Sequence, residues 1–480
     1  MTRVVRSAVL AVLLLLPAVA ARAMETDLAK NPQVADAIAA FDVVVQKIAR
    51  EREQPGLSVG LVYGDRLIWS KGYGYADLAK KTPATPATAY RVASITKLFT
   101  ATAILQLRDA GRLRLDDPVV KHLPWFAPRD SFADDPPITI RHLMTHTSGL
   151  TRELDTLYWD DGAFPDHDAL VRMVNGAWTI QPREKELKYS NVAVALEGEI
   201  VAGVSGESWA GYVKKHILEP LGMTHTEPLP TRDLPTLTTG YHLRLPGQAR
   251  RVAPFVDIKA MSPCGAIAST VEDLARFVSL QFADTASSGP VVLRGSSLRE
   301  MHRVQFLNPE WTRGYGLGWG VRRAGDQVRI QHGGSLPGNA TMISAAPAER
   351  FGVIVLTNAD DGRPDLYVDK AWSIVAPAVK KAVAGADMKD TADPSWARYA
   401  GDYEWIDGTT SKVLLLSDGL YLLDMTADDP WGDRVRLEPV SPGVFRMKGG
   451  SQQDELVRFE SDAAGRVIRL REPGYSAKRR

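Results

Sequence analysis

Apolar residues recur three and four positions apart between Asp36 and Arg50, with polar residues between them. This spacing gathers the apolar side chains on one helix face and predicts an amphipathic helix. The pattern then changes to two runs rich in β-branched and aromatic residues, Leu57 to Tyr63 and Leu67 to Tyr73, separated by Gly64-Asp65. Two such runs around a short turn predict a β-hairpin.

A similar pattern returns far along the chain at Val328 to Gln331, Ala340 to Ala345 and Phe351 to Asn358. Turn residues separate these runs, which predicts three strands. We expect them to join the hairpin in one antiparallel sheet. The segment Tyr367 to Val383 is apolar at helical spacing and predicts a helix that packs on this sheet.

Between the two strand regions, Leu98 to Leu113 combines helical periodicity with strong helix formers. Ser94 is therefore expected in the first turn of a long buried helix. Lys97, three residues on, would lie on the same helix face, close enough to hydrogen-bond the serine oxygen. The alternative is a serine N-cap followed by a solvent-exposed lysine.

The composition changes after the predicted terminal helix. Gly385 to Ser395 reads as a linker. The residues beyond it, 396–480, contain short alternating runs punctuated by glycine turns and predict a small antiparallel β domain. The runs are Lys412 to Leu416, Leu420 to Leu423, Val435 to Val440, Val444 to Met447, Leu456 to Phe459 and Val467 to Leu470. The final Lys478-Arg479-Arg480 is expected to be a solvated tail.

Composition describes an ordinary protein with a large core of its own. The 480 residues are 45% hydrophobic and 24% charged, with a formal net charge of +1. These values exclude a disordered chain. A near-neutral balance without long basic runs also argues against nucleic acid as a partner.

The first 23 residues have the pattern of an export signal. Arg3 and Arg6 precede an apolar run from Ala8 to Ala20, and Ala21-Arg22-Ala23 offers a cleavage site. The run is short for a membrane span, so the mature protein is expected to lack one, an uncleaved anchor being the alternative. The only cysteine, Cys264, excludes an intrachain disulfide and is expected to be a buried apolar residue. We expect a periplasmic or secreted protein.

Three short strings carry the candidate chemistry: Ser94-Ile-Thr-Lys97, Tyr189-Ser-Asn191 and His332-Gly-Gly334. The first is weak alone, but the three together and in this order are specific. They and further landmarks between about residues 40 and 360, such as Thr139 to Leu150, resemble the serine β-lactamase and penicillin-binding protein superfamily. The similarity is greatest to its class C-like hydrolases, esterases and D-aminopeptidases.

This resemblance implies an α/β fold in which helices cover an antiparallel sheet over residues 24–384, with a helical subdomain between roughly residues 110 and 260. The C-terminal β domain resembles the lipocalin-like modules appended to some superfamily members. The implied activity is hydrolysis of an ester or amide through a covalent acyl-enzyme on Ser94. Alternatives are a D,D-carboxypeptidase, D-aminopeptidase or β-lactamase, and a penicillin-binding sensor without turnover.

A serine hydroxyl needs a base to accept its proton during attack. Lys97 and Tyr189 are the candidates, and their coupled titration leaves the assignment open. We favour Tyr189 as the main base with Lys97 as its partner. In an extended loop, Asn191 would point the same way as Tyr189 and could bond both Lys97 and the carbonyl of an acyl chain.

The glycines of the third string are expected at the end of a strand, where Gly334 lets substrate backbone approach. The resemblance implies that the backbone NH groups of Ser94 and Ser335 hold the oxyanion. His332 stands where many relatives have lysine, so carboxylate binding, and with it penicillin hydrolysis, is expected to be weak.

Neither a cofactor nor a metal is implied. His142-x-x-x-His146 lacks the glutamate of a zinc protease motif, and no phosphate-binding loop is evident. The expected partner is a small-molecule or peptide substrate, and the sequence does not define the oligomeric state.

Overall fold

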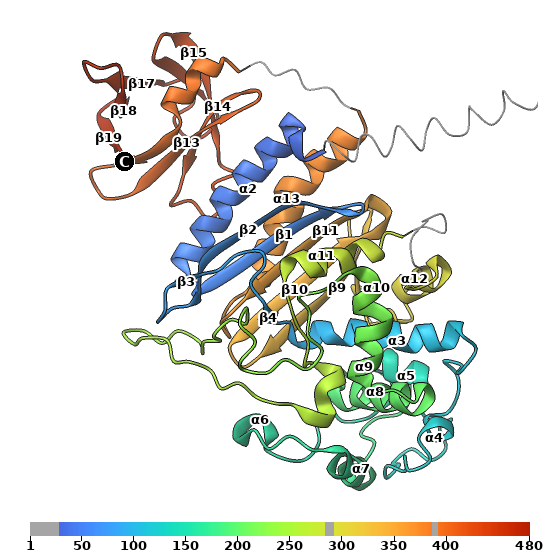
Figure 1. Ribbon diagram of the computed structural model, residues 1–480. Coiled ribbons are helices and arrows are strands. Elements are labelled where there is room, and N and C mark those ends of the chain that lie inside the picture. Colours follow the sequence, from blue (N-terminus) through green and yellow to red (C-terminus); the bar gives the residue numbers. More distant parts are fainter. Residues whose placement is uncertain (1–27, 284–291, 386–391) are drawn as a thin grey trace, which may run out of the picture. The chain divides into compact units, whose positions relative to one another are not determined.

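The computed structural model describes residues 28–283, 292–385 and 392–480. The predicted signal peptide and residues 386–391 of the predicted linker lie outside the described residues. Residues 53–368 form one compact unit, which contains the large sheet labelled in Figure 1. Residues 1–52 and 369–480 form a second unit. The predicted domain boundaries at residues 384 and 396 stay predictions.

Nine antiparallel strands make the sheet of the first unit, in the order β3-β2-β1-β11-β10-β9-β8-β7-β6. The strands are β1 (Gly56–Tyr63), β2 (Arg66–Asp77), β3 (Thr82–Pro83), β6 (Phe306–Leu307), β7 (Arg313–Tyr315), β8 (Gly320–Ala324), β9 (Gln327–Leu336), β10 (Asn339–Ala346) and β11 (Phe351–Thr357). The predicted hairpin and the three distant strands are confirmed as neighbours, because β1 pairs with both β2 and β11.

The centre of this sheet is buried, since all eight residues of β1 and all seven of β11 are buried side by side in the fold. Helix α11 (Val271–Leu280) packs on β1, β2 and β11. Gly60 makes this close approach possible, because a Cβ there would lie 2.4 Å from Cγ1 of Val271. The absence of a side chain on the strand therefore lets the helix pack close to the sheet.

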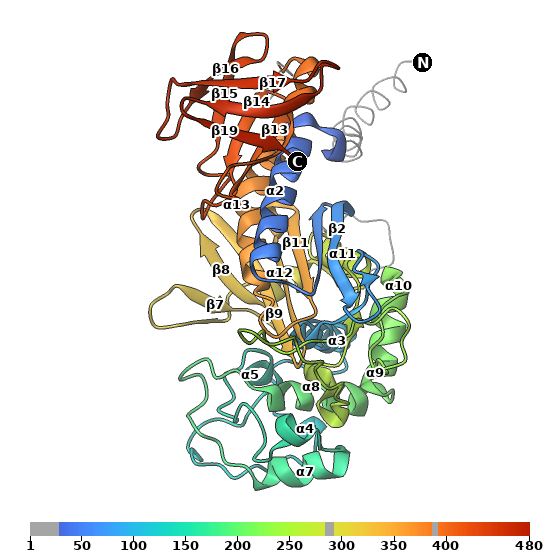
Figure 2. The ribbon, with the colours of Figure 1, turned by 90° about the vertical axis from the view of Figure 1, so that its left-hand side faces the viewer.

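Most of the remaining helices of this unit belong to the segment between β4 (Tyr90–Arg91) and β5 (Ala268–Ser269), seen from the side in Figure 2. They are α3 (Thr96–Asp109), α4 (Val119–His122), α5 (Ile140–Met144), α6 (Tyr158–Asp161), α7 (His167–Gly176), α8 (Asn191–Ser205), α9 (Trp209–Val213) and α10 (Glu219–Leu221); α12 (Gly295–His302) follows α11. Helices α3 and α8 pack against each other in one hydrophobic core.

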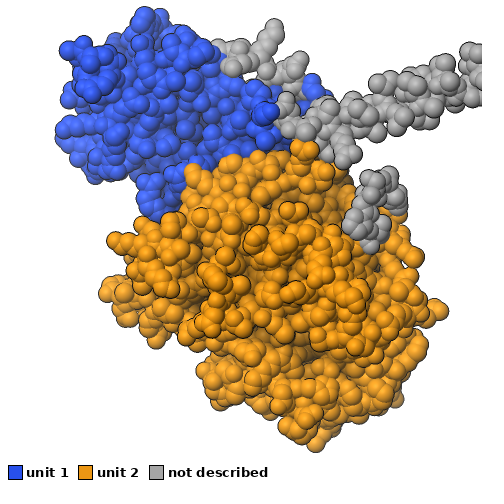
Figure 3. Space-filling view, in the orientation of Figure 1, with its two compact units in different colours: residues 1–52, 369–480 blue, residues 53–368 orange. Residues whose placement is uncertain are grey.

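The second unit, coloured separately in Figure 3, contains α2 (Pro32–Glu51), α13 (Pro364–Val383) from residue 369 on, and a closed eight-stranded antiparallel barrel. The barrel strands are β12 (Gly401–Glu404), β13 (Thr410–Leu416), β14 (Gly419–Asp424), β15 (Val435–Ser441), β16 (Val444–Lys448), β17 (Leu456–Ser461), β18 (Val467–Glu472) and β19 (Tyr475–Arg479). Both predicted helices and the six predicted strands are confirmed, and the fold class with them.

The predicted solvated tail is wrong. Lys478 and Arg479 belong to β19, which pairs with β18 and β12 and so closes the barrel. Arg479 donates hydrogen bonds to the carbonyls of Arg398 and Ala400. Closing the barrel removes exposed strand edges. The backbone pairing of β19 with two distant strands therefore outweighs the preference of its charged residues for a solvated conformation. None of the helices in the described ranges is both long and apolar enough to cross a membrane.

Candidate active site

Ser94 lies in a short 3-10 turn, Ala93–Ile95, that leads from β4 into α3. The prediction that Ser94 lies in the first turn of the α-helix is therefore wrong: the serine lies in the 3-10 turn just before α3. Ala93 adopts φ 50, a left-handed conformation that is strained for a residue with a side chain. The kink lies directly before Ser94, whose side chain is partly exposed.

Lys97, in the first turn of α3, is 2% exposed. Its Nζ donates to Ser94 Oγ over 3.0 Å and to the carbonyl of Cys264 over 2.6 Å. A buried ammonium is costly unless its donors are satisfied. Two of its donors have protein acceptors, and one of these acceptors is the hydroxyl of Ser94.

Tyr189 precedes α8 and its ring faces two cations. Lys97 Nζ lies 5.0 Å from the ring centroid, and Arg152 Cζ lies 5.3 Å from it. The ring of His146 packs at 4.4 Å between centroids. Among the described residues none hydrogen-bonds to the Tyr189 hydroxyl. Two cationic side chains therefore face the ring of the candidate base.

Asn191 differs from the expectation. It is the first residue of α8, with Ser190 as the N-cap, and not part of an extended loop. Its Nδ2 donates to Glu153 Oε1 over 2.5 Å, and no hydrogen bond joins it to Lys97. The Oδ1 atom is buried without a partner among the described residues. Helical geometry at this position directs the amide to Glu153, and the free carbonyl oxygen remains available for a donor.

The His-Gly-Gly string is also placed differently. It lies inside β9, which continues to Leu336. A Cβ on Gly334 would lie 2.2 Å from the carbonyl oxygen of Val92, whereas a Cβ on Gly333 would come no closer than 3.7 Å to any neighbouring atom. The second glycine is therefore required because β9 packs directly against the turn that carries Ser94.

His332 is 7% exposed. Its Nδ1–H donates to the carbonyl of Gly333 over 2.8 Å, and Nε2 lies 3.4 Å from the Tyr315 hydroxyl. Burial, together with the charge of Lys97, lowers the pKa of His332 to about 4. The imidazole is therefore neutral at pH 7 and supplies no positive charge to the site.

Glu197 of α8 was not identified from the sequence. It is 2% exposed, and its Oε1 has no partner among the described residues. Burial raises the pKa of Glu197 to about 8, although the charge of Lys97 opposes the shift. The signal was present, because this glutamate interrupts an otherwise apolar helix sequence, Val192 to Leu196.

Arg152 and Glu153 were also missed, since no local pattern marks them. They line a pocket of about 480 Å³ together with Ser94, Asn191 and Ser335. Glu153 also accepts a hydrogen bond from the hydroxyl of Tyr158 over 2.6 Å. The pocket thus brings together the serine, the predicted amide and the residue after the glycines. Further lining residues are Trp159, His242, Cys264, Gly265, Leu336, Pro337 and Asp360.

The histidines set aside as metal ligands have other contacts. His142 Nδ1 accepts from the backbone NH of Thr139, and His146 Nδ1 accepts from that of Ser190. No group of three or more His, Cys, Asp or Glu side chains in the described part of the chain is arranged to hold a metal ion. Burial raises the pKa of the Cys264 thiol to about 11, so it stays protonated.

A helix-flanked antiparallel sheet, with a serine and a buried lysine at the start of one helix, is the arrangement of the serine hydrolases related to penicillin-binding proteins. A family model described as Beta-lactamase matches residues 41–376, and the chain belongs to this family.

Individual relatives are distant. The chain is 28% identical to protein flp of Staphylococcus aureus strain N315 over 324 residues, which cover 66% of this chain and 62% of flp. The chain thus matches less than two thirds of that relative. A penicillin-binding protein homologue from Pyrococcus abyssi, described as octameric, has 22% identity and a TM-score of 0.62, covering 92% of this chain and 99% of its own. A β-lactamase/D-alanine carboxypeptidase from Yersinia pestis has 25% identity and a TM-score of 0.58, covering 72% and 99%.

Proposed function

We propose that this protein is an exported serine hydrolase that cleaves an ester or amide through an acyl-enzyme on Ser94. The observation that carries the proposal is the 3.0 Å hydrogen bond from Lys97 Nζ to Ser94 Oγ at the wall of a pocket. A buried lysine in contact with a partly exposed serine is the pair that nucleophilic attack needs.

In the first step, Ser94 Oγ attacks the acyl carbon and its proton passes to the basic pair formed by Tyr189 and Lys97. We favour Tyr189 as the acceptor, because Lys97 and Arg152 both face its ring. The same pair then delivers the proton to the leaving group. Water attacks the ester on Ser94 and the pair accepts a proton from this water. The pair returns that proton to Ser94 Oγ as the bond between Ser94 and the acyl group breaks, and the acyl group leaves as a carboxylic acid.

The negative charge that develops on the carbonyl oxygen requires donors fixed in advance. We assign this role to the backbone NH groups of Ser94 and Ser335. Both residues line the same pocket. Gly334 packs closely on Val92, so β9, which carries Ser335, lies against the turn that carries Ser94. Asn191, with its free Oδ1, and His332 would orient the acyl chain.

Electrostatics favour an ester over a carboxylate-bearing β-lactam. His332 is neutral at pH 7 because its pKa is lowered to about 4. Arg152 is the arginine in the pocket wall. Its side chain is 63% exposed, so solvent weakens its attraction for an anion. Export is proposed from the signal pattern of residues 1–23.

A second candidate is an aminopeptidase for D-amino acid peptides, favoured by two carboxylates in the pocket wall. Glu153 and Asp360 both line the pocket and could attract a substrate ammonium group.

Turnover of three probes tests the proposal. p-Nitrophenyl butyrate, D-alanine p-nitroanilide and nitrocefin are each incubated with the full chain, and the intact mass of the protein is recorded. We expect the ester to be cleaved fastest and a transient adduct to map to Ser94. Ser279→Ala, in α11, is the matched control for Ser94→Ala. An unchanged rate in Ser94→Ala would contradict the mechanism, and an adduct without turnover would indicate a sensor.

A further inference from the structure

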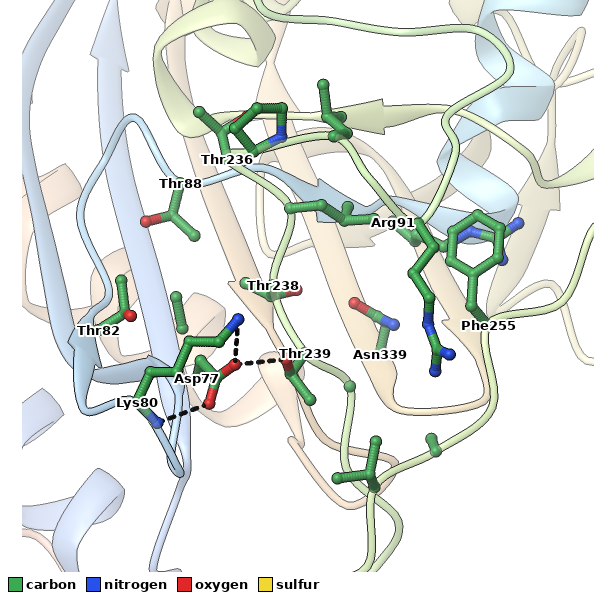
Figure 4. A pocket seen from close by; sticks show the side chains of 18 of the residues that line it. Asp77, Lys80, Thr82, Thr88, Arg91, Thr236, Thr238, Thr239, Phe255 and Asn339 are labelled. Carbon is green, nitrogen blue, oxygen red and sulfur yellow. Dashed lines mark hydrogen bonds and ion pairs between the residues drawn. The ribbon is translucent and has the colours of Figure 1, made fainter.

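Residues 53–368 contain a second pocket, of about 920 Å³, that the proposed chemistry does not use (Figure 4). Its walls come from the β2–β3 hairpin, from β4, from loops 232–240 and 252–255, and from the turn between β9 and β10. Pro337 lines both this pocket and the one beside Ser94. The volume is within the usual range for small-ligand sites.

Three side chains that line this pocket have buried polar atoms without a hydrogen-bond partner among the described residues: Arg91 Nε, Thr238 Oγ1 and Asn339 Oδ1. Their exposed fractions are 6%, 9% and 4%. Such atoms are rare in folded proteins because each forfeits its hydration. Three of them around one pocket provide donors and an acceptor for a polar ligand.

Arg91 gives the pocket a positive charge. Its Nη1 donates to the carbonyl of Val256 over 2.6 Å, and its Cζ lies 4.7 Å from the ring centroid of Phe255. In the described part of the chain no carboxylate lies within 4.0 Å of it. Burial lowers the pKa of Arg91 to about 10, with Asp257 opposing the shift, so the guanidinium is charged at pH 7. A buried cation without a paired anion favours an anionic ligand.

The mouth of the pocket differs from its interior. Lys80 pairs with Asp77 over 3.5 Å, and the Lys80 side chain is 80% exposed. Thr239 donates a hydrogen bond to the same carboxylate. Figure 4 shows this pair among the threonines that line the pocket, including Thr88 and Thr236. These hydroxyl groups suit a ligand that carries amide or hydroxyl groups beside its charge.

We propose that this pocket binds a small carboxylate that also bears an amide or hydroxyl group, with the carboxylate on Arg91 and the polar group between Thr238 and Asn339. A ligand with these groups can come from two sources. It is either the distal end of a substrate whose acyl group lies at Ser94, reaching past Pro337, or a separate small molecule.

Binding of N-acetylalanine, compared with N-acetylalaninamide, tests the site directly. The titrations are followed by saturation-transfer NMR on the full chain after Ser94 is blocked with a fluorophosphonate. If Ser94 does not react, the Ser94→Ala chain is used, so failure of the proposed mechanism does not affect this test. We expect the acid to bind at least about 10-fold more tightly than the amide.

Three substitutions locate the binding. Arg91→Gln should abolish the preference for the acid, and Arg322→Gln, an exposed arginine on β8, is the matched control that should leave it intact. Arg91 also donates a hydrogen bond to the carbonyl of Val256, so its replacement could disturb the fold. Asn339→Asp is therefore a second variant. It places a carboxylate beside the ligand and should weaken the acid about 10-fold without affecting the amide.

Equal affinity for acid and amide, or unchanged acid binding in Asn339→Asp, would overturn the proposal. If Asn339→Asp weakens binding of the acid but leaves KM unchanged for ester substrates with a distal carboxylate, the ligand is a separate molecule. If Asn339→Asp instead raises KM only for ester substrates with a distal carboxylate, and leaves p-nitrophenyl butyrate unchanged, the pocket is a substrate subsite.

Discussion

The unit that carries Ser94 and the C-terminal barrel use buried polar side chains in different ways. In residues 53–368, buried groups include Arg91, Lys97 and Glu197, each with few partners. Among the described residues of the barrel strands, only Ser411 and Glu472 are buried polar side chains. The barrel core is otherwise apolar and aromatic, as in the stacked pair Tyr399 and Phe459.

This difference indicates where function has constrained the sequence. Desolvated charges and the left-handed Ala93 reduce stability, and the surrounding close packing must hold them in place. A closed barrel with an apolar core needs no such compensation. The candidate chemistry of the described chain is therefore concentrated in residues 53–368, and substitutions in the two regions should have different effects.

The largest effect is expected from Ser94→Ala. Removing the nucleophile should lower kcat/KM for p-nitrophenyl butyrate by about four orders of magnitude or more. The melting temperature should change little, because the side chain is partly exposed and accepts a single hydrogen bond from Lys97. Steady-state kinetics and calorimetry measure both values. A loss smaller than about 10-fold would refute Ser94 as the nucleophile.

Gly334→Ala should have the next largest effect. The new Cβ would lie 2.2 Å from the Val92 carbonyl oxygen, so β9 or the Ser94 turn must move. We expect a loss of about 100-fold in kcat and of about 2 kcal/mol in the free energy of unfolding. Gly333→Ala is the matched control, since its Cβ would have no contact closer than 3.7 Å. Similar losses in both variants would contradict the packing argument.

Glu197→Gln should change the pH dependence of stability. Because the pKa of Glu197 is raised to about 8, the folded state keeps a proton that the unfolded state loses above about pH 4.5. Wild-type stability should therefore fall between pH 5 and pH 8. The variant should be more stable than wild type by about 2 kcal/mol at pH 8 and similar at pH 5. Urea unfolding at both pH values measures this, with Glu199→Gln as the control on the same helix.

Glu472→Gln should have the smallest effect. Burial also raises the pKa of this barrel glutamate, so its contribution to stability likewise falls as the pH rises. We expect a gain below about 1 kcal/mol at pH 8 with unchanged esterase activity. A change in activity comparable to that of Gly334→Ala would show that the barrel takes part in catalysis.

Local patterns predicted most of the elements. Alternation and helical spacing identified α2, α13, the hairpin and six of the eight barrel strands, because apolar periodicity reflects which face is buried. The strand β19 was missed, because its charged residues look like a solvated end and its stability comes from pairing with β12 and β18. The sequence therefore identified the segments with a strong local signal and missed those held by distant partners.

The amino-acid order by itself placed Lys97 three residues after Ser94, close enough for the hydrogen bond between them that the structure shows. It also identified the three strings that the fold brings near one another. Only the tertiary structure decided that Asn191 bonds Glu153, that Gly334 packs against Val92, and that burial lowers the pKa of His332 to about 4. Burial, close approach and the field of a distant charge arise from residues far apart in the chain, and no local pattern encodes them.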